Sequence, residues 1–156
     1  LFLWQTPTQI TKQVEEVLAF LEKAGIAKHS KAEFWSLIGD TEQLSYVHHM
    51  AECMDESLQR LAIITSLVTR LEPLTRRDLE QKVVAIAKRL AVLNNITAPE
   101  FIDKKAQATL INTLREQEYI VLNEDGLLTT TDSMQQLKDS VTNLVAIEVL
   151  QSIARS

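Results

Sequence analysis

The sequence predicts a mainly α-helical fold, a helical bundle with two short β-hairpins whose order of elements is winged-helix-like. Three observations predict it. The 156 residues include only 3 Gly and 3 Pro, too few for the many tight turns of a sandwich or barrel. Apolar residues recur at spacings of three and four along most of the chain. Helix-capping residues stand at the start of these periodic segments.

The composition bounds what the chain can be. Apolar residues make up 46% and charged residues 24%, which is normal for a globular protein, and the length suffices for a proper core. The net charge of −5 argues against nonspecific nucleic-acid binding, because such binding needs Lys and Arg to neutralise phosphates. A single cysteine cannot form an internal disulfide, which allows a reducing compartment. Uncharged runs such as residues 61–69 are too short to span a bilayer.

The first two helices are expected in the first half of the chain. Thr6 can cap the first, Pro7 suits its first turn, and Gly25 ends it. The second should begin near Asp40 and end before Pro73. Both carry apolar stripes, and we expect that of the second to be buried; the stripes are Ile10, Val14, Val17, Leu18 and Leu21 in the first, and Leu44, Val47, Ala51, Met54, Leu58, Leu61 and Val68 in the second.

Three further helices follow. A capping box at residues 75–78 opens a helix that runs to Asn94 and Asn95, and residues 97–100 open a fourth. Asp132 is expected to cap the last helix. The inner faces of the last two are predicted to hold Phe101, Leu110, Ile111 and Leu114 in one, and Leu137, Val141, Leu144, Val145 and Val149 in the other.

Two hairpins are predicted between these helices. Residues 119–131 contain two apolar runs around Asp125 and Gly126, a favourable hairpin turn. Residues 25–39 form a weaker version with a longer loop. The order helix, hairpin, helix thus occurs twice, with Ile26 and Ile120 in corresponding places, so two related helix–hairpin–helix units are an alternative description.

The second hairpin and the three helices before it have the order of a winged-helix unit, a shape that often binds DNA through its third helix. That helix carries Glu100, Asp103, Glu116 and Glu118 against Lys104, Lys105 and Arg115. Because this face is not basic, we expect a winged-helix shape used for packing or protein contact rather than DNA binding.

The stretch VHHMAECMD (residues 47–55) is a candidate site for metal or acid–base chemistry. His48 lies four residues before Glu52, and His49 four before Cys53, so each pair could share a helix face. A zinc site needs three or four protein ligands, and catalysis by Cys53 would need an oxyanion hole that no Gly-rich turn supplies. The sequence therefore favours part of a helix surface, and we assign no catalytic, cofactor-binding or metal-binding residue.

The most basic segment lies in the third predicted helix. Its cations are candidates for contact with anionic lipid or an acidic partner surface, and they are Arg76, Arg77, Lys82, Lys88 and Arg89. Asp78 and Glu80 are interleaved, as on an ordinary solvated helix face. Elsewhere, Phe34 and Trp35 are adjacent, so in a strand they would point to opposite faces and one could be exposed for contact with a further part of a longer polypeptide.

Residues 55–68 and 74–120 resemble the C-terminal region of the bacterial membrane-bound glycerol-3-phosphate acyltransferases. The most specific matching pieces are Leu58-Gln59-Arg60, residues 87–95, Ala98-Pro99-Glu100-Phe101, and Asp103-Lys104. The start on LFLW, without Met, also suggests a segment of a longer polypeptide. The resemblance implies an enzyme that transfers an acyl group from acyl-CoA or acyl carrier protein to the sn-1 hydroxyl of glycerol 3-phosphate. It also implies phospholipid synthesis at the cytoplasmic face of the bacterial inner membrane.

The catalytic motif of that family, His-x4-Asp, is absent from this sequence. His49 and Asp55 are separated by five residues rather than four, and five positions after His29 stands Phe34. We therefore expect residues 1–156 to be a non-catalytic accessory domain that packs on the rest of a parent enzyme, with segments 1–39 (helix plus hairpin), 40–131 (winged-helix-like) and 132–156 (terminal helix). Two rivals remain open: a stand-alone interaction or regulatory module, and a hydrolase or metalloenzyme using residues 48–55.

Overall fold

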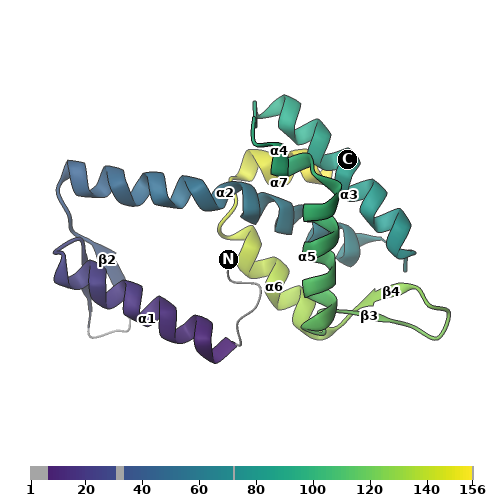
Figure 1. Cartoon of the computed structure of the whole chain (residues 1–156), viewed down its shortest axis with the longest axis horizontal. Coiled ribbons are helices and arrows are strands. Elements are labelled where there is room, and N and C mark those ends of the chain that lie inside the picture. Colours follow the sequence, from purple (N-terminus) through teal and green to yellow (C-terminus); the bar gives the residue numbers. More distant parts are fainter. Residues whose placement is uncertain (1–6, 31–33, 72, 156) are drawn as a thin grey trace. The chain divides into compact units, whose positions relative to one another are not determined.

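The structure is a computed structural model that describes residues 7–30, 34–71 and 73–155, without the side chains of residues 7–10, 13 and 53 (Figure 1). It is mainly helical with two small antiparallel sheets, as predicted. The chain forms two compact units, Leu1–Cys53 and Met54–Ser156. The boundary falls inside one long helix and within the predicted segment 40–131. The division into segments 1–39, 40–131 and 132–156 stays an interpretation of the sequence.

The first unit begins with helix α1 (Pro7–Lys23) and the hairpin of strands β1 (Ala27–His29) and β2 (Trp35–Leu37). Gly25 ends α1 as predicted, in the left-handed conformation with φ of 72°. Its amide donates to the carbonyl of Glu22 at 3.0 Å, and the Ile26 amide donates to that of Leu21 at 2.9 Å. These two bonds form a Schellman motif, which turns the chain directly into β1. The predicted cap, Thr6, lies outside the described residues.

Helix α2 (Thr41–Arg70) starts where the sequence predicts. Asp40 Oδ1 accepts from the Gln43 amide at 2.9 Å, and Gln43 Oε1 accepts from the Asp40 amide at 3.0 Å. This reciprocal capping box satisfies two amides that the helix itself leaves unpaired. The first half of α2 belongs to the first unit and the second half to the second.

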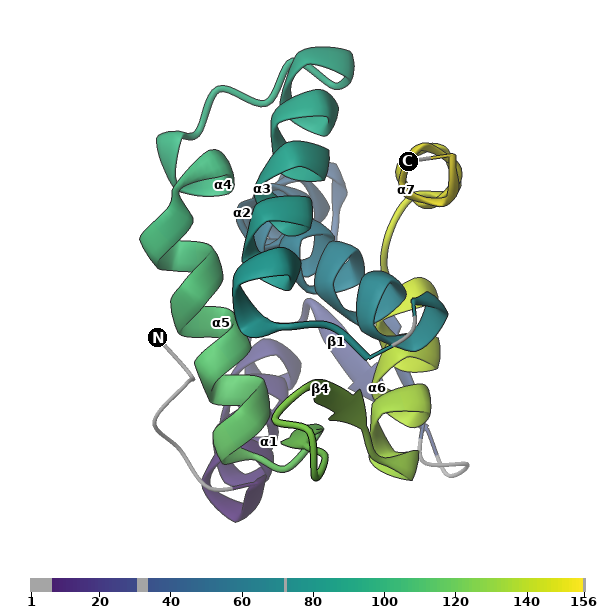
Figure 2. The ribbon, with the colours of Figure 1, turned by 90° about the vertical axis from the view of Figure 1, so that its right-hand side faces the viewer.

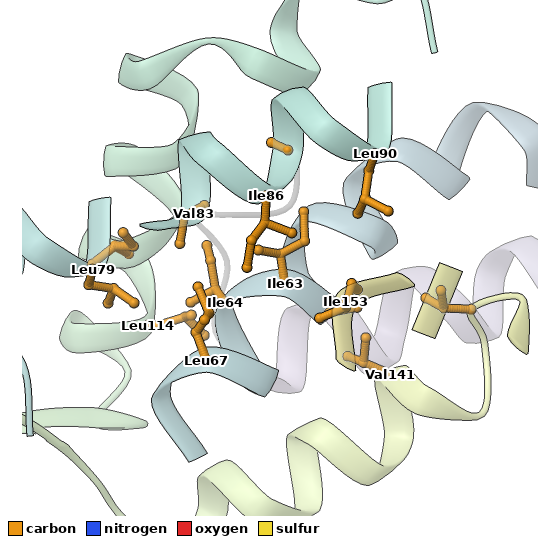
Figure 3. Packing of buried hydrophobic residues seen from close by; sticks show 14 of the residues in the cluster. Ile63, Ile64, Leu67, Leu79, Val83, Ile86, Leu90, Leu114, Val141 and Ile153 are labelled. Atoms are coloured by element: carbon orange, nitrogen blue, oxygen red, sulfur yellow. The ribbon is translucent and has the colours of Figure 1, made fainter. Parts of the chain in front are cut away.

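The second half of α2 is the central helix of the second unit. Ala62, Ile63, Ile64 and Leu67 are at most 2% exposed although they point in different directions around the helix. Figure 3 shows Ile63 and Ile64 among core side chains of other helices. The predicted stripe is therefore partly wrong: Leu58, Leu61 and Val68 are half-buried, and Ala51 and Met54 are exposed. A helix that is apolar on all sides is buried on all sides, and a stripe describes only a helix at a surface.

Helix α3 (Arg76–Leu93) has the predicted boundaries. Thr75 caps it, because its Oγ1 accepts from the Asp78 amide at 3.1 Å. Asn95, with φ of 51°, lies just beyond its end. The buried face of α3 meets the core of the second unit, and its residues are Leu79, Val83, Ile86, Ala87 and Leu90.

The two remaining predicted helices are each broken in two. The fourth consists of α4 (Pro99–Ile102) and α5 (Lys104–Glu116), which pack beside α3 (Figure 2). Asp103 between them is extended and accepts from the Ala106 amide at 2.8 Å, so it caps a new helix instead of continuing the old one. The last consists of α6 (Asp132–Thr142) and α7 (Ile147–Ala154).

The side chains of these helices largely keep the predicted roles. Phe101, Ile111 and Leu114 are buried, as are Val141, Val145 and Val149, but Leu144 in the break is 63% exposed. The residue before α6 also differs, because Thr131 rather than Asp132 occupies the cap position. The hydroxyl of Thr131 donates to the Glu118 carbonyl at 2.9 Å, which ties the start of α6 to the end of α5.

The second hairpin joins β3 (Ile120–Leu122) to β4 (Leu128–Thr130), with Gly126 at φ of 74° in the turn as predicted. Leu74, between α2 and α3, adds an antiparallel bridge to Leu128, with the Leu128 amide 2.8 Å from the Leu74 carbonyl oxygen. The winged-helix interpretation stays a prediction.

The two hairpins repeat the same backbone pattern at an offset of 93 residues (118 − 25 = 93). Glu118, like Gly25, has a positive φ and follows a helix end, and the next amide bonds back to the helix in both copies. The outermost pairs, Ile26 with Ile38 and Tyr119 with Thr131, and the inner ladder pairs then follow in the same register. The predicted match of Ile26 to Ile120 is therefore wrong by one position: Ile26 matches Tyr119.

Candidate functional site

The histidine-rich stretch of α2 forms a small exposed cluster around one carboxylate. Glu52 Oε2 lies 2.9 Å from His49 Nδ1, and Glu52 Oε1 lies 3.2 Å from His48 Nε2. All three side chains are more than half exposed, and no group of three metal-ligating side chains occurs among the described residues. The Cys53 side chain lies outside the description. An exposed cluster of this kind does not exclude water, and the interpretation of the stretch as part of a helix surface stays a prediction.

The hydrogen bond from the His49 ring, followed by the charges of His48 and His49, lowers the pKa of Glu52 below the usual value of 4.5. A carboxyl whose pKa is lower in the folded state stabilises that state above its unfolded pKa, and loses the effect as the pH falls through the folded pKa. We expect a carbon-detected NMR titration to place Glu52 below 4.5, and the His49→Ala variant to raise it. Tyr46→Ala, an exposed change on the same helix, should leave the titration unchanged. A wild-type Glu52 that titrates at 4.5 or above would contradict the expectation.

The five basic residues of α3 are all exposed, but they do not converge on one point. Arg76 is paired, with Nε 2.9 Å from Glu80 Oε1. At about 100° per residue, Arg77 and Lys88 fall in line on one flank, and Lys82 and Arg89 on another roughly 120° away. The exposed cations therefore form a broad basic outer side of α3, which also includes the exposed Asp78.

A polar joint that the sequence did not predict connects α2, α4 and α5; it consists of Arg60, Glu100, Phe101 and Gln107. Arg60 Nη1 donates to the Glu100 carbonyl at 3.3 Å, and Gln107 Nε2 donates to the Phe101 carbonyl at 2.7 Å. Gln107 is fully buried, and its Oε1 has no hydrogen-bond partner among the described residues. The joint thus binds two carbonyls of the four-residue helix α4, of which the Glu100 carbonyl also accepts from the Asp103 amide.

The joint explains two of the family-like sequence pieces. Leu58-Gln59-Arg60 and Ala98-Pro99-Glu100-Phe101 are about 40 residues apart in sequence, and the Arg60 bond to Glu100 brings them together. The sequence contains one signal for it: Gln107 occupies a core position among the apolar residues Phe101, Ile111 and Leu114. A polar side chain at such a position indicates a specific buried partner. Nothing in the joint resembles a nucleophile with its base, so its chemistry is structural.

The comparisons with known proteins agree with the resemblance seen in the sequence. The family described as the glycerol-3-phosphate acyltransferase C-terminal region matches residues 1–123. The chain is 64% identical over 155 residues to a glycerol-3-phosphate acyltransferase of Colwellia psychrerythraea, covering 99% of this chain and 19% of that protein. It is 33% identical over 143 residues to one from Shewanella oneidensis, covering 92% and 17%. No solved structure matches it.

Proposed function

The chain belongs to the family of glycerol-3-phosphate acyltransferase C-terminal regions, and from that premise we propose that it is a non-catalytic accessory domain of such an enzyme. The parent enzyme would transfer an acyl group from acyl-CoA or acyl carrier protein to glycerol 3-phosphate. The observation that carries the proposal is coverage: the chain spans about a fifth of the length of the curated relatives it matches. Its partner would then be the remainder of the same polypeptide.

The chemistry of the residues supports a non-catalytic role. None of the three histidines is followed by Asp at the fifth position, which the His-x4-Asp motif of the family requires. A general base must reach the proton that it removes while water is kept from the reaction, yet His48 and His49 lie on an exposed helix surface bonded to Glu52. These observations fit a structural scaffold better than a catalytic acid–base pair.

An acyl-transfer assay tests this proposal. We expect the 156-residue chain to give no turnover of acyl-CoA and glycerol 3-phosphate above a blank, whereas the longer protein that contains it turns over both. The reason is that the acid–base pair would lie outside these residues. Turnover by the 156 residues alone would contradict a non-catalytic role, and the His48→Ala, His49→Ala double variant would then show whether α2 supplies the base.

The basic outer side of α3 supports a second step of the proposal, contact with the anionic cytoplasmic face of the inner membrane. No described helix is long and apolar enough to cross a bilayer. Each basic residue near an anionic membrane contributes on the order of 1 kcal/mol. Several exposed cations on one side of a helix would thus help a parent enzyme to hold this region at the lipid surface.

Vesicle flotation tests the membrane contact. We expect the chain to bind vesicles rich in anionic lipid, and the triple variant Arg77→Glu, Lys82→Glu, Lys88→Glu to lower the partition coefficient by roughly two orders of magnitude. The matched control, Lys12→Glu, Lys23→Glu, Lys28→Glu, changes the net charge equally in the first unit and should bind better than the α3 variant. Equal binding of the wild type to anionic and neutral vesicles would contradict the proposed contact with anionic lipid.

A further inference from the structure

Helix α1 carries an apolar face that the described residues leave largely uncovered; we call Val14, Val17, Leu18 and Leu21 the α1 face. Val14 and Val17 are 51% and 52% exposed, and Leu18 and Leu21 are half-buried. Phe20 on the adjacent flank is 68% exposed. The spacings of three and four between these residues are those of a helix that packs against another surface.

The second unit supplies an internal standard for this face. At the offset of 93 residues, the α1 face corresponds to Gln107, Leu110, Ile111 and Leu114 of α5, which also precedes a hairpin of the same register. Gln107 and Ile111 are 0% exposed and Leu114 is 4% exposed. They belong to or adjoin the core to which α2 and α3 contribute. The same backbone motif thus has its helix face covered in one copy and bare in the other.

We propose that the α1 face docks on an apolar helical surface contributed by the part of the acyltransferase polypeptide outside these 156 residues. This inference rests on the proposed function. The occupant follows from two observations: helices cover the equivalent face of α5, and about four-fifths of each curated relative lies outside the matched region. The charges near the face are mixed, with Lys12 paired to Glu16, so its apolar side chains provide the main recognition.

The hairpin extends this docking surface. Phe34, just before β2, is 71% exposed, and Leu37 at the end of β2 and Ile38 after it are 56% and 55% exposed. The matching positions of the second hairpin, Leu127, Thr130 and Thr131, are all half-buried. The first hairpin therefore has apolar Leu37 and Ile38 where the second has Thr130 and Thr131. All three of its positions are also more exposed than their counterparts in the second hairpin.

Photo-crosslinking in the longer acyltransferase that contains this chain tests the proposal. Benzoylphenylalanine keeps the phenyl ring of Phe20 or Phe34 and adds a benzoyl group, which these two exposed positions can hold; the control replaces Val92, an 83% exposed residue of α3. We expect Phe20 and Phe34 to crosslink within one polypeptide to peptides outside residues 1–156, and Val92 not to reach those peptides. Crosslinks only to residues 54–156, crosslinks between two copies, or none at all would each overturn the proposal.

A charge substitution provides a second readout. Because Val17 is exposed, Val17→Asp should shift the melting temperature of the 156-residue chain little, but lower that of the longer enzyme by several degrees. Val92→Asp should affect neither strongly. An equal, small shift in both proteins would contradict docking. Acyl transfer by the wild-type longer protein is measured separately, so failure of the proposed function is distinguished from failure of this surface.

Discussion

Replacing Phe101 by alanine is expected to lower the free energy of unfolding of the second unit by about 3–5 kcal/mol. Phe101 is fully buried and is the one buried residue of the short helix α4. A helix of 4 residues cannot hold itself by its own hydrogen bonds, so the ring is the main apolar attachment of α4 to the core. Removing it leaves a cavity and also loosens the carbonyls that Arg60 and Gln107 bind.

Urea denaturation followed by circular dichroism measures this effect. Both tryptophans, Trp4 and Trp35, precede residue 54, so tryptophan fluorescence reports on the first unit and should change little in this variant. Ile102→Ala is the matched control, because Ile102 is the next residue on the same helix and is 38% exposed. A loss for Phe101→Ala no larger than that for Ile102→Ala would show that α4 is not anchored through the ring.

Local signals predicted most helix boundaries. Gly25, Asp40 and Thr75 each form the end or cap expected of them, because capping depends on a few neighbouring residues. The breaks at Asp103 and after Thr142 were missed for different reasons. Asp103 is a capping residue inside a periodic segment, where the apolar pattern suggested continuity. No Gly or Pro marks the second break, so it depends on packing rather than on local sequence.

Burial was harder to predict than helix position. The run of residues 61–69 contains apolar side chains in every direction, and only the assembled unit shows that α2 is central there. In the first half of the same helix, Ala51 and Met54 continue the apolar pattern but are exposed. Periodicity indicates that a face can be covered, whereas the neighbours decide whether it is.

The polar joint shows the same limit. The sequence separates Arg60 from Glu100 by 40 positions, and its pattern contains no information on which carbonyl the guanidinium meets. The family resemblance marked both pieces as specific without giving a reason. The structure supplies one: both pieces hold α4 in place. Residues that mark a family can thus reflect a demanding point of assembly rather than chemistry on a substrate.

Gln107→Glu is expected to make the stability of the second unit strongly dependent on pH. Gln107 is fully buried, and its amide donates to the Phe101 carbonyl. An ionised carboxylate at this position would be desolvated, and it would lie against the Phe101 carbonyl oxygen with no proton between the two oxygens. Both effects disfavour the charged form, so the folded-state pKa of the introduced Glu would rise above the unfolded value of about 4.3. The folded state then binds the extra proton, and its stability falls as the pH rises above the unfolded pKa.

The size of this effect has a ceiling, because the folded protein can keep the introduced carboxyl protonated. The penalty grows by at most about 1.4 kcal/mol per pH unit, which gives about 4 kcal/mol at pH 7. Below about pH 4 the neutral acid can donate its O–H to the Phe101 carbonyl, so the variant should approach the wild type. Urea titrations at several pH values measure the slope, and Gln81→Glu, an exposed change on α3, should shift stability by no more than about 0.5 kcal/mol. A pH-independent loss in the Gln107 variant would mean that the side chain is not held dry, and that α4 and α5 separate enough to admit water.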